Sequence, residues 1–361
     1  MQVCRIALAA CLGLVLLMLS APAQAQYRLT ILDSNQLGLV NPGHNGAQAV
    51  HVDPLLANPW GLAHSATGPW YVPDNDTGWT TVYNATGGQI RLRISIPTAG
   101  SENGSAQGGN GPGTPTGIVS NGSSTDFQVQ GMPATFLFDT LDGTISAYVP
   151  GVNANQAIIV VDNSANGALY QGLAITSYPS GNFLYAADNA NNVVDMYDGN
   201  FNLVKSFGDP NIPSNFSVFN VQDINGMVYV CYAVPNYGSG GYVDLFTENG
   251  VLVKTLIQGL PLNQAWGVAL APGNFGPLSN TLLISNNSYN GTINGFDPNT
   301  GKFVGTIRDQ KGKQVILNNL WGIAFGGGNS SSGATNELFV TVGNGNGSLN
   351  ELAGTFLSIE P

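Results

Sequence analysis

The sequence predicts an all-β protein, a six-bladed β-propeller with four-stranded blades. The first observation is a short motif that recurs six times, with its central Gly or Asn at positions 61, 117, 172, 220, 267 and 322. The second is another motif that keeps pace with it, in which Gly or Asn precedes aliphatic, small polar and aromatic residues. The third is the run of short alternating segments between turn residues, with no convincing amphipathic helix. A β repeat of about 50 residues is typical of a propeller blade.

The first motif predicts the inner strand of each blade. Trp60-Gly61-Leu62-Ala63 returns at residues 266–269 and 321–324, with weaker copies at 116–119, 171–174 and 219–221. Inner strands converge on the axis, where a side chain would collide with the neighbouring backbone, so Gly is expected at this position. We expect the repeated tryptophans to pack between neighbouring blades, each burying on the order of 150–250 Å². The alternative is that they lie exposed at the channel mouth and stack on a sugar.

The second motif predicts a strand followed by a hairpin. Its copies lie at residues 143–148, 192–197, 241–246 and 291–296, with a looser copy at 78–83. Turn sequences such as Asp198-Gly199-Asn200 follow, and Gly and Asn accept the positive φ of tight turns.

The ends of the chain predict how the ring closes. The sixth repeat, from residue 320 to 359, has too few strands for a complete blade. Residues 27–32 precede the first repeat and form an unpartnered strand. We therefore expect this N-terminal strand to complete the last blade, which hides the edges at the seam of the ring. Residues 33–57 would be a crossing arm and residues 98–114 a Gly-rich loop, and residues 26–361 would form a single propeller domain.

The first 25 residues predict a secretory signal. Arg5 precedes an apolar run at residues 6–19, and Ala23-Gln24-Ala25 is a cleavage site of the small-x-small type. No other stretch approaches the roughly 20 apolar residues of a membrane helix. The protein is therefore expected to be exported, to the periplasm or the outside of the cell.

Composition excludes several classes of partner. The net charge is −11 and only 9% of residues are charged, which argues against nucleic acid and anionic membrane surfaces as partners.

Cys231 is the single cysteine after the predicted signal, and we expect it to be a small buried apolar residue. The histidines, His44, His51 and His64, have no spacing that indicates a catalytic base, and no Gly-x-Ser-x-Gly motif occurs.

Polar residues are expected to gather at one mouth of the central channel, where second strands end and inner strands begin. The candidate ligand-binding residues are Asn58, Asp74, Asn75, Asp188, Asn189, Asn263, Asn286, Asn287, Asn318 and Asn344. Oxygen ligands suit hard cations, so Asp74 and Asp188 are candidate ligands for Ca²⁺. The alternative is that Asp and Asn end strands because they cap turns and tolerate left-handed backbone.

The chain resembles a family of secreted bacterial six-bladed propellers whose members often carry a C-terminal PEP-CTERM sorting tail. The matching phrases are NPWGLAHSATGPWYVPDN, VDNSANGALYQGLAI, PLNQAWGVALAP and GTINGFDPNTGKFVGTIRD. The resemblance covers nearly the whole chain after the predicted signal, although this sequence ends at Pro361 without the tail. More distantly it is similar to NHL-repeat and gluconolactonase-like propellers, which implies a metal at the channel mouth. The lactonases place a Glu at the start of an inner strand. At the matching positions this sequence has Asn58 or other uncharged residues.

These observations favour an exported binding or interaction module that requires no cofactor. Its partner would be a small molecule, a glycan or a protein. The first alternative is a lactonase-like hydrolase that depends on a divalent metal, with Asp74 and Asp188 as ligands or general base. The second alternative is a structural protein of the envelope or extracellular matrix.

When the full chain is expressed in a bacterial host, we expect a mature protein that begins at Gln26, because signal peptidase needs small residues at its cleavage site. N-terminal sequencing of the exported protein checks this. The variant Ala25→Arg should remain uncleaved, and a native N-terminus at Cys11 would contradict the assignment.

Overall fold

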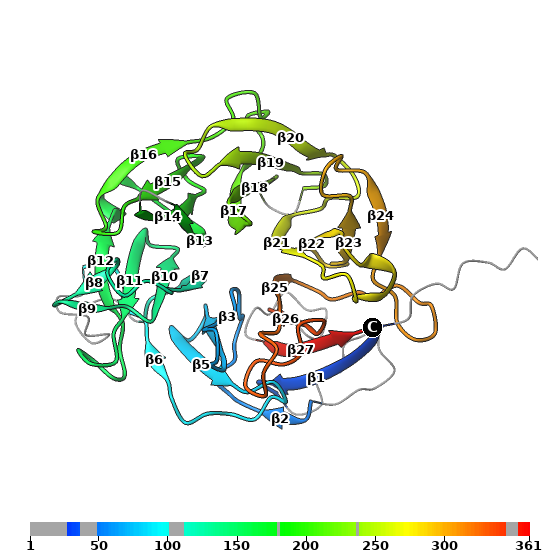
Figure 1. Ribbon diagram of the computed structural model, residues 1–361, viewed down its shortest axis with the longest axis horizontal. Coiled ribbons are helices and arrows are strands. Elements are labelled where there is room, and N and C mark those ends of the chain that lie inside the picture. Colours follow the sequence, from blue (N-terminus) through cyan, green and yellow to red (C-terminus); the bar gives the residue numbers. More distant parts are fainter. Residues whose placement is uncertain (1–26, 37–48, 101–111, 179–180, 236–237, 344–352) are drawn as a thin grey trace, which may run out of the picture.

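The computed structural model is a ring of six β-sheets around a central axis, which confirms the predicted six-bladed β-propeller (Figure 1). The structure describes residues 27–36, 49–100, 112–178, 181–235, 238–343 and 353–361. The predicted signal and most of the predicted Gly-rich loop lie outside the described residues. Strands within a blade pair antiparallel, and they follow one another from the axis outward. Among the described residues no helix is long and apolar enough to cross a membrane.

The first four blades each have four strands, ordered from the axis to the rim. Blades 1 and 2 consist of β3 (Ala63–His64), β4 (Trp70–Asp74), β5 (Trp79–Tyr83) and β6 (Ile94–Ser95), then β7 (Pro115–Ser120), β10 (Phe136–Thr140), β11 (Thr144–Tyr148) and β12 (Ile158–Asp162). Blades 3 and 4 consist of β13 (Tyr170–Tyr178), β14 (Gly181–Asp188), β15 (Val193–Tyr197) and β16 (Leu203–Phe207), then β17 (Ser217–Ile224), β18 (Met227–Ala233), β19 (Tyr242–Thr247) and β20 (Leu252–Gln258).

The last two blades follow the same order. Blade 5 consists of β21 (Ala265–Leu270), β22 (Leu282–Asn286), β23 (Ile293–Phe296) and β24 (Phe303–Thr306). Blade 6 consists of β25 (Leu320–Phe325), β26 (Leu338–Val342), β27 (Thr355–Glu360) and β1 (Arg28–Ser34). The remaining elements are β2 (His51–Val52), a small hairpin of β8 (Gln128–Val129) and β9 (Met132–Pro133), and the 3₁₀ turns Ser164–Asn166 and Gly276–Leu278.

The N-terminal strand closes the ring as predicted. Strand β1 pairs antiparallel with β27, from Arg28 opposite Glu360 to Ser34 opposite Thr355. The crossing arm then adds β2 to the outside of β1 as a fifth, parallel strand. The hydroxyl of Tyr27 donates to the carbonyl of Phe275 at 2.9 Å, which ties the start of β1 to blade 5.

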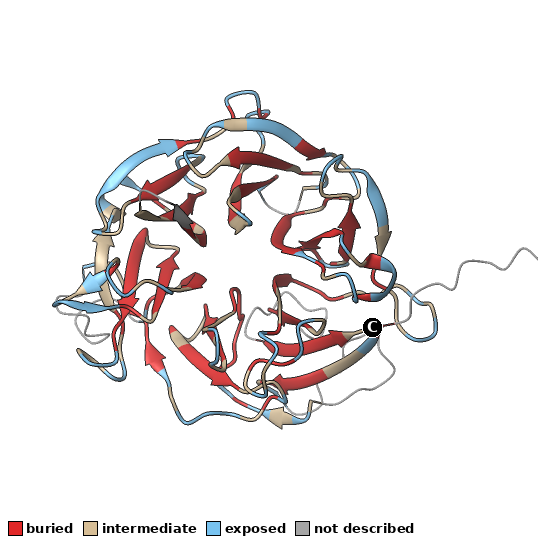
Figure 2. Cartoon of the chain, in the orientation of Figure 1, coloured by how far each residue is buried: buried red, intermediate tan, exposed pale blue. Residues whose placement is uncertain are grey.

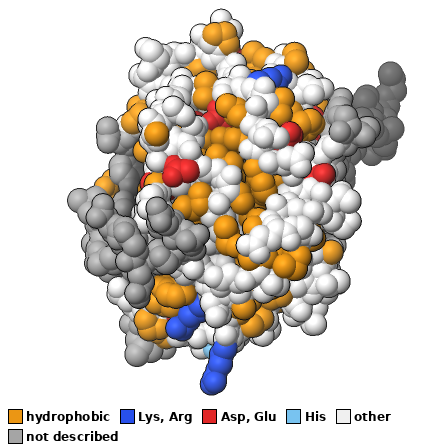
Figure 3. Space-filling model, turned by 90° about the vertical axis from the view of Figure 1, so that its left-hand side faces the viewer, with side chains coloured by type: hydrophobic (Ala, Val, Ile, Leu, Met, Phe, Trp, Pro, Cys, Tyr) orange, Lys and Arg blue, Asp and Glu red, His pale blue; other side chains and the backbone are white. Residues whose placement is uncertain are grey.

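The apolar core lies between the blades. One cluster joins blades 2 and 3 and includes Leu137, Ile145, Tyr170 and Leu184. Cys231 on β18 is fully buried, as expected for a small apolar side chain. Figure 2 shows that the strands nearer the axis are buried and that β16, β20 and β24 are exposed at the rim. The rim seen in Figure 3 carries many apolar and few charged side chains.

The repeated glycines lie where neighbouring inner strands meet. A Cβ on Gly117 would lie 2.4 Å from the backbone nitrogen of Leu173 in the next blade. A Cβ on Gly322 would lie 2.7 Å from the carbonyl oxygen of Trp60. Real Cβ atoms do not approach other atoms so closely, so the expected reason for these glycines is confirmed. Blade 4 has Asn220 at this position, and its Nδ2 donates to the Trp266 carbonyl at 2.7 Å.

Hydrogen bonds between blades follow from this close approach. The backbone N–H of Gly61 donates to the Thr116 carbonyl at 2.9 Å. The Ser285 hydroxyl donates to the Trp321 carbonyl at 2.6 Å, and the Thr341 hydroxyl to the Trp60 carbonyl at 2.5 Å. Second strands therefore supply hydroxyls that link one inner strand to the next.

Replacing Gly117 by Ala should destabilise the fold by about 1–3 kcal/mol, because the added methyl group forces two backbones apart. Urea unfolding followed by circular dichroism measures the change. Gly122→Ala is the matched control, since a Cβ there meets no atom within 4 Å. Equal stability of the two variants would contradict the packing argument.

Candidate functional site

Two rings of side chains surround one mouth of the central channel. The first ring comes from the residue before the repeated Gly or Asn of each inner strand: Trp60, Thr116, Gln171, Phe219, Trp266 and Trp321. The second ring comes from the end of each second strand: Asn75, Leu141, Asn189, Ala233, Asn287 and Gly343. The register is the same in every blade. The residue just before each second-ring residue pairs with the residue just before the first-ring residue of the same blade. Those pairs are Pro59–Asp74, Pro115–Thr140, Tyr170–Asp188, Val218–Tyr232, Ala265–Asn286 and Leu320–Val342.

The three repeated tryptophans form a cluster on the axis. Trp60 and Trp321 stack with ring centroids 3.6 Å apart, and Trp266 meets Trp321 edge-on at 5.7 Å. The indole N–H of Trp266 in blade 5 donates a hydrogen bond to the backbone carbonyl of Gln171 in blade 3 at 2.9 Å. They pack, as expected, but against one another in the channel rather than between the sheets of adjacent blades. All three are at most 6% exposed, so they close the channel below this mouth.

A cavity of about 330 Å³ lies above this tryptophan cluster, and we name it the tryptophan mouth. Its lining residues are Trp60, Leu141, Gln171, Asn189, Phe219, Ala233, Pro235, Gln264, Asn287 and Trp321. None of these described side chains is titratable near neutral pH. The cavity therefore combines aromatic surface with neutral amides, and its lining carries no charge.

Three polar groups of the tryptophan mouth are buried without a hydrogen-bond partner among the described residues. They are the indole nitrogen of Trp60, the amide oxygen Oε1 of Gln171 and the amide nitrogen Nδ2 of Asn287. A buried polar group without a partner costs about 1–3 kcal/mol. Two donors and one acceptor of residues that line this cavity therefore lack a partner among the described residues.

Equivalent asparagines at this mouth have different roles. Asn75 Nδ2 donates to the Pro115 carbonyl at 3.1 Å, and Asn189 Nδ2 to the Val218 carbonyl at 2.7 Å. Each of these bonds ties a second strand to the inner strand of the next blade. Asn287 occupies the same position in blade 5, but its Nδ2 has no partner in the described part of the chain. The side-chain amides of Asn75 and Asn189 therefore hold neighbouring blades together, whereas the amide nitrogen of Asn287 is free to bind a ligand.

The other predicted asparagines among the described residues do not line the cavity. Asn58 Oδ1 accepts the indole N–H of Trp321 at 3.2 Å, which orients that ring. Asn286 Oδ1 accepts the backbone N–H of Asn263 at 2.8 Å, and its Nδ2 donates to the Pro261 carbonyl at 3.1 Å. Asn318 is buried and does not line the cavity. Asn344 lies outside the described residues.

Asp188 caps a turn. Its Oδ1 accepts the backbone N–H groups of Leu169 at 3.1 Å and Asn191 at 3.2 Å, and its Oδ2 accepts Asn191 Nδ2 at 2.7 Å. This arrangement is the strand-ending role expected in the alternative to metal binding. Among the described residues, no group of three or more His, Cys, Asp or Glu side chains lies close enough to hold a metal ion.

Asp74 is the second candidate carboxylate, and it is fully buried outside the lining of the tryptophan mouth. Hydrogen bonding with Thr81 lowers the pKa of its carboxylate, although burial outweighs this effect. Burial raises the pKa of Asp74 well above its ordinary value, and the charge of Asp53 adds to this effect. Asp74 therefore does not line the tryptophan mouth, contrary to the expectation; its carboxylate lies close enough to Asp53 and Asp33 for their charges to raise its pKa.

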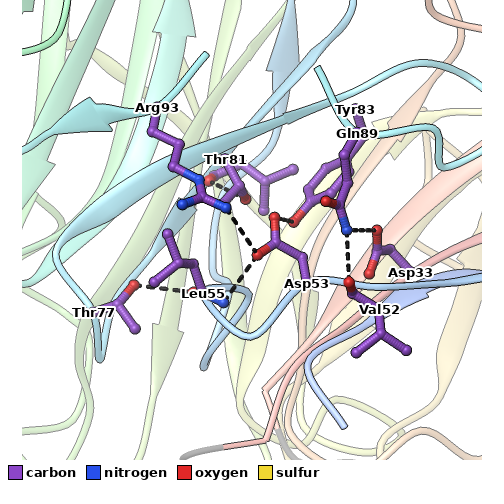
Figure 4. Close-up of polar contacts among 10 residues, drawn as sticks. Asp33, Val52, Asp53, Leu55, Thr77, Thr81, Tyr83, Gln89 and Arg93 are labelled. Atoms are coloured by element: carbon purple, nitrogen blue, oxygen red, sulfur yellow. Dashed lines mark hydrogen bonds and ion pairs between the residues drawn. The ribbon is translucent and has the colours of Figure 1, made fainter. Parts of the chain in front are cut away.

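Buried carboxylates gather at the seam of the ring, where the arm after β1 crosses blade 1. Figure 4 shows Gln89 Nε2 donating to Asp33 Oδ2 at 3.1 Å and the Tyr83 hydroxyl donating to Asp53 Oδ2 at 3.3 Å. The guanidinium of Arg93 lies 3.9 Å from Asp53. Burial raises the pKa of Asp33 to about 7, with a further contribution from the charge of Asp53.

Six cavity residues were not predicted from the sequence: Leu141, Gln171, Phe219, Ala233, Pro235 and Gln264. Gln171 and Phe219 occupy the tryptophan position of weaker motif copies, so aligning all six repeats locates them. Gln264 precedes Trp266 by two residues, as Asn58 precedes Trp60 and Asn319 precedes Trp321. All three have positive φ, at 59°, 48° and 49°. The predicted Asn263 and Asn318 each lie one residue before this shared position.

Comparisons with known proteins identify relatives by sequence. The protein R648 of Acanthamoeba polyphaga mimivirus, described only as uncharacterised, is 31% identical over 298 residues, covering 77% of this chain and 70% of R648. The uncharacterised L690 of the same virus is 30% identical over 297 residues, covering 76% of this chain and 75% of L690. The chain therefore belongs to the same family as these viral proteins. It also matches R640 at 31% identity over 265 residues, 67% of this chain, and spans about half (48%) of R640. No family model matches the chain.

Solved propellers are similar in fold at low sequence identity. A streptogramin B lyase has a TM-score of 0.52 and 13% identity, with 94% of this chain and all of the lyase covered. A protein of unknown function from Bacteroides thetaiotaomicron has a TM-score of 0.53 and 11% identity, with 92% of this chain and 76% of that chain covered. These likenesses show the six-bladed propeller fold alone.

Stability should fall as the pH rises from about 4 to about 8. Asp33 binds its proton more tightly in the folded chain, with a pKa near 7, than in the unfolded chain, where 3.8 is ordinary. The folded state therefore holds the extra proton between these values, and the stability that it confers is lost as the pH passes 7. Asp33→Asn should flatten the slope by at most about 1.4 kcal/mol per pH unit.

Urea unfolding at a series of pH values measures this slope. Asp162→Asn, which removes an exposed carboxylate on β12, is the control for the loss of one negative charge. A slope unchanged by Asp33→Asn would contradict the assignment to Asp33.

Proposed function

We propose that this protein is a binding module that holds a neutral small molecule or glycan at the tryptophan mouth. The observation that carries the proposal is the set of three unpartnered buried groups, Trp60 Nε1, Gln171 Oε1 and Asn287 Nδ2, around an uncharged cavity. A ligand with a carbonyl or hydroxyl oxygen and one donor would satisfy them. Each such hydrogen bond removes a cost that the free protein bears.

The aromatic lining favours a ligand with a flat face. Trp60, Trp321 and Phe219 offer ring surface at the base of the cavity, and a sugar ring or a planar amide stacks well on such a surface. A charged ligand would lose its hydration without gaining a partner, because no charged side chain of the described residues lines the cavity. These two features together favour neutral over ionic ligands.

We also propose that the protein acts after export. The support is the sequence of residues 1–25 and its basic, apolar and small-residue segments. The resemblance to secreted bacterial propellers of the PEP-CTERM-associated family agrees with this location. A protein partner of the exposed, weakly charged rim is compatible with the same role.

The lactonase-like alternative has less support than binding. A lyase or hydrolase at this mouth would need an acid, a base or a metal, and the described lining offers amides and apolar side chains only. The Asp188 carboxylate, a candidate ligand, already accepts three N–H groups. We therefore propose that binding requires no cofactor, with Ca²⁺ as the alternative to be tested.

Asn287→Ala should weaken ligand binding about tenfold with little loss of stability, because its amide nitrogen makes no bond within the described part of the free protein. Isothermal titration with a panel of neutral saccharides and aromatic amides identifies the ligand and measures the change. Asn75→Ala is the matched control at the equivalent position of blade 1. It should lower the melting temperature, by loss of the bond to Pro115, and leave affinity unchanged.

Two results would contradict this proposal. One is an affinity that Asn287→Ala leaves intact, and the other is a panel in which no neutral compound binds. The cofactor is tested separately by the melting temperature, which we expect to be the same in Ca²⁺ and in chelator. A Ca²⁺-dependent rise that chelator reverses would favour the metal-dependent alternative.

A further inference from the structure

The opposite end of the channel holds a second and larger cavity, of about 560 Å³, which we name the aliphatic mouth. It lies on the other side of the tryptophan cluster, where the inner strands end. Each blade contributes one residue at the same level: His64, Ser120, Ile175, Asp223, Leu270 and Phe325. Between the two mouths the channel narrows to a space of about 40 Å³ that includes Trp266, so the cavities are separate.

Aliphatic side chains form part of the wall of the aliphatic mouth, beside the polar side chains of Ser120, Gln222 and Asn225. Leu62, Val119, Ile175, Ile224, Val268 and Ile323 line it together with Phe325 and Leu270. Leu270 is 36% exposed there, although aliphatic side chains gain about 25 cal/mol for each Å² removed from water. A ligand with an apolar body would cover this surface.

One carboxylate lies in this wall. Asp223 lies at the end of β17, and its Oδ2 is buried with no hydrogen-bond partner among the described residues. The pKa of Asp223 is raised to about 6, mainly by burial and also by the charge of Glu248, against the lowering effect of hydrogen bonds from Thr176 and the backbone of Gly226. The carboxylate therefore lacks the counter-charge that would compensate for its lost hydration.

The described residues of the wall supply no such counter-charge. Neither Lys nor Arg is among the described side chains that line the aliphatic mouth. His64 does line it, but its ring nitrogens lie 2.8 Å from the Ser65 carbonyl oxygen and 3.3 Å from the Phe325 carbonyl oxygen. Both ring nitrogens of His64 thus contact backbone carbonyls, of blade 1 and of blade 6. Blade 4, which carries Asp223, lies opposite blade 1 in the ring (Figure 1).

We propose that the aliphatic mouth is a second binding site, for an organic cation with an apolar body and an ammonium group. The body fills the hydrocarbon funnel and the ammonium group pairs with Asp223. An ion pair is stronger where a partner is partly removed from water, and Asp223 Oδ2 is buried in this wall. The chemistry differs from that of the tryptophan mouth, where the lining is neutral, so the two sites bind different classes of ligand.

Three adamantane compounds test this site, because they share one apolar cage and differ in the charge of the head group. The probes are 1-aminoadamantane, adamantan-1-ol and adamantane-1-carboxylate, titrated calorimetrically at about pH 7.5, where Asp223 is ionised. We expect the amine to bind about tenfold more tightly than the alcohol and the carboxylate to bind more weakly than both.

Asp223→Asn keeps the shape of the side chain and removes its charge. It should abolish the preference for the amine while the affinity for the alcohol stays within about twofold. Asp162→Asn, which alters an exposed carboxylate on the rim, should keep the preference and so controls for net charge. Circular dichroism of each variant verifies that it is folded.

Leu270→Ser tests the apolar wall and should weaken the amine and the alcohol alike. Asn287→Ala, at the tryptophan mouth, should change the affinity for neither the amine nor the alcohol. The test of the aliphatic mouth is therefore independent of the proposal for the tryptophan mouth. The inference is overturned by wild-type protein that binds amine and alcohol equally or binds neither. It is also overturned by an Asp223→Asn variant that keeps the preference.

Discussion

The close approach of the six inner strands is the constraint on which the rest of the structure depends. At Gly61, Gly117, Gly267 and Gly322 the backbone of the next blade occupies the space that a Cβ would need. The strand pairing shifts register at this point in blades 3, 5 and 6, for example between Ala265 and Val268. Such an irregularity re-aims a side chain, and here the residue before the Gly enters the channel. Packing at the axis and the placement of the tryptophans therefore have one cause.

The tryptophan cluster then divides the channel into two cavities of different chemistry. Trp60, Trp266 and Trp321 come from three consecutive blades and contact one another because equal positions in the repeat face the same axis. The other three blades place Thr116, Gln171 and Phe219 at this level, so the ring is not symmetric. We expect ligand-binding groups at repeat positions whose residues differ between blades, because a residue shared by all blades serves the packing of the fold. Asn287 differs from Asn75 and Asn189 in this way: the same residue at the same position lacks a partner among the described residues.

Much of the fold and part of the site could be predicted from the sequence. The spacing of the repeats and the spare strand at residues 27–32 predicted six blades and their closure by β1. The mouth residues Asn189 and Asn287 were found because second strands end at the same register. Asp74 was misplaced, because the sequence does not show toward which side a buried carboxylate turns. Gln171 was missed, since a single copy of a degenerate motif carries little information until all six copies are superposed.

The sequence by itself determined the architecture, because the repeat period and the Gly positions are set by local strand geometry and by contact between identical neighbours. Only the tertiary structure decided which polar groups are satisfied. Whether Asn287 Nδ2, Gln171 Oε1 or Asp223 Oδ2 finds a partner depends on atoms from other blades, far away in the chain. A hydrogen bond is lost over a displacement of less than one ångström, and a repeat pattern does not resolve such a distance. The scaffold can thus be read from the sequence, and the ligand-binding groups require the folded ring.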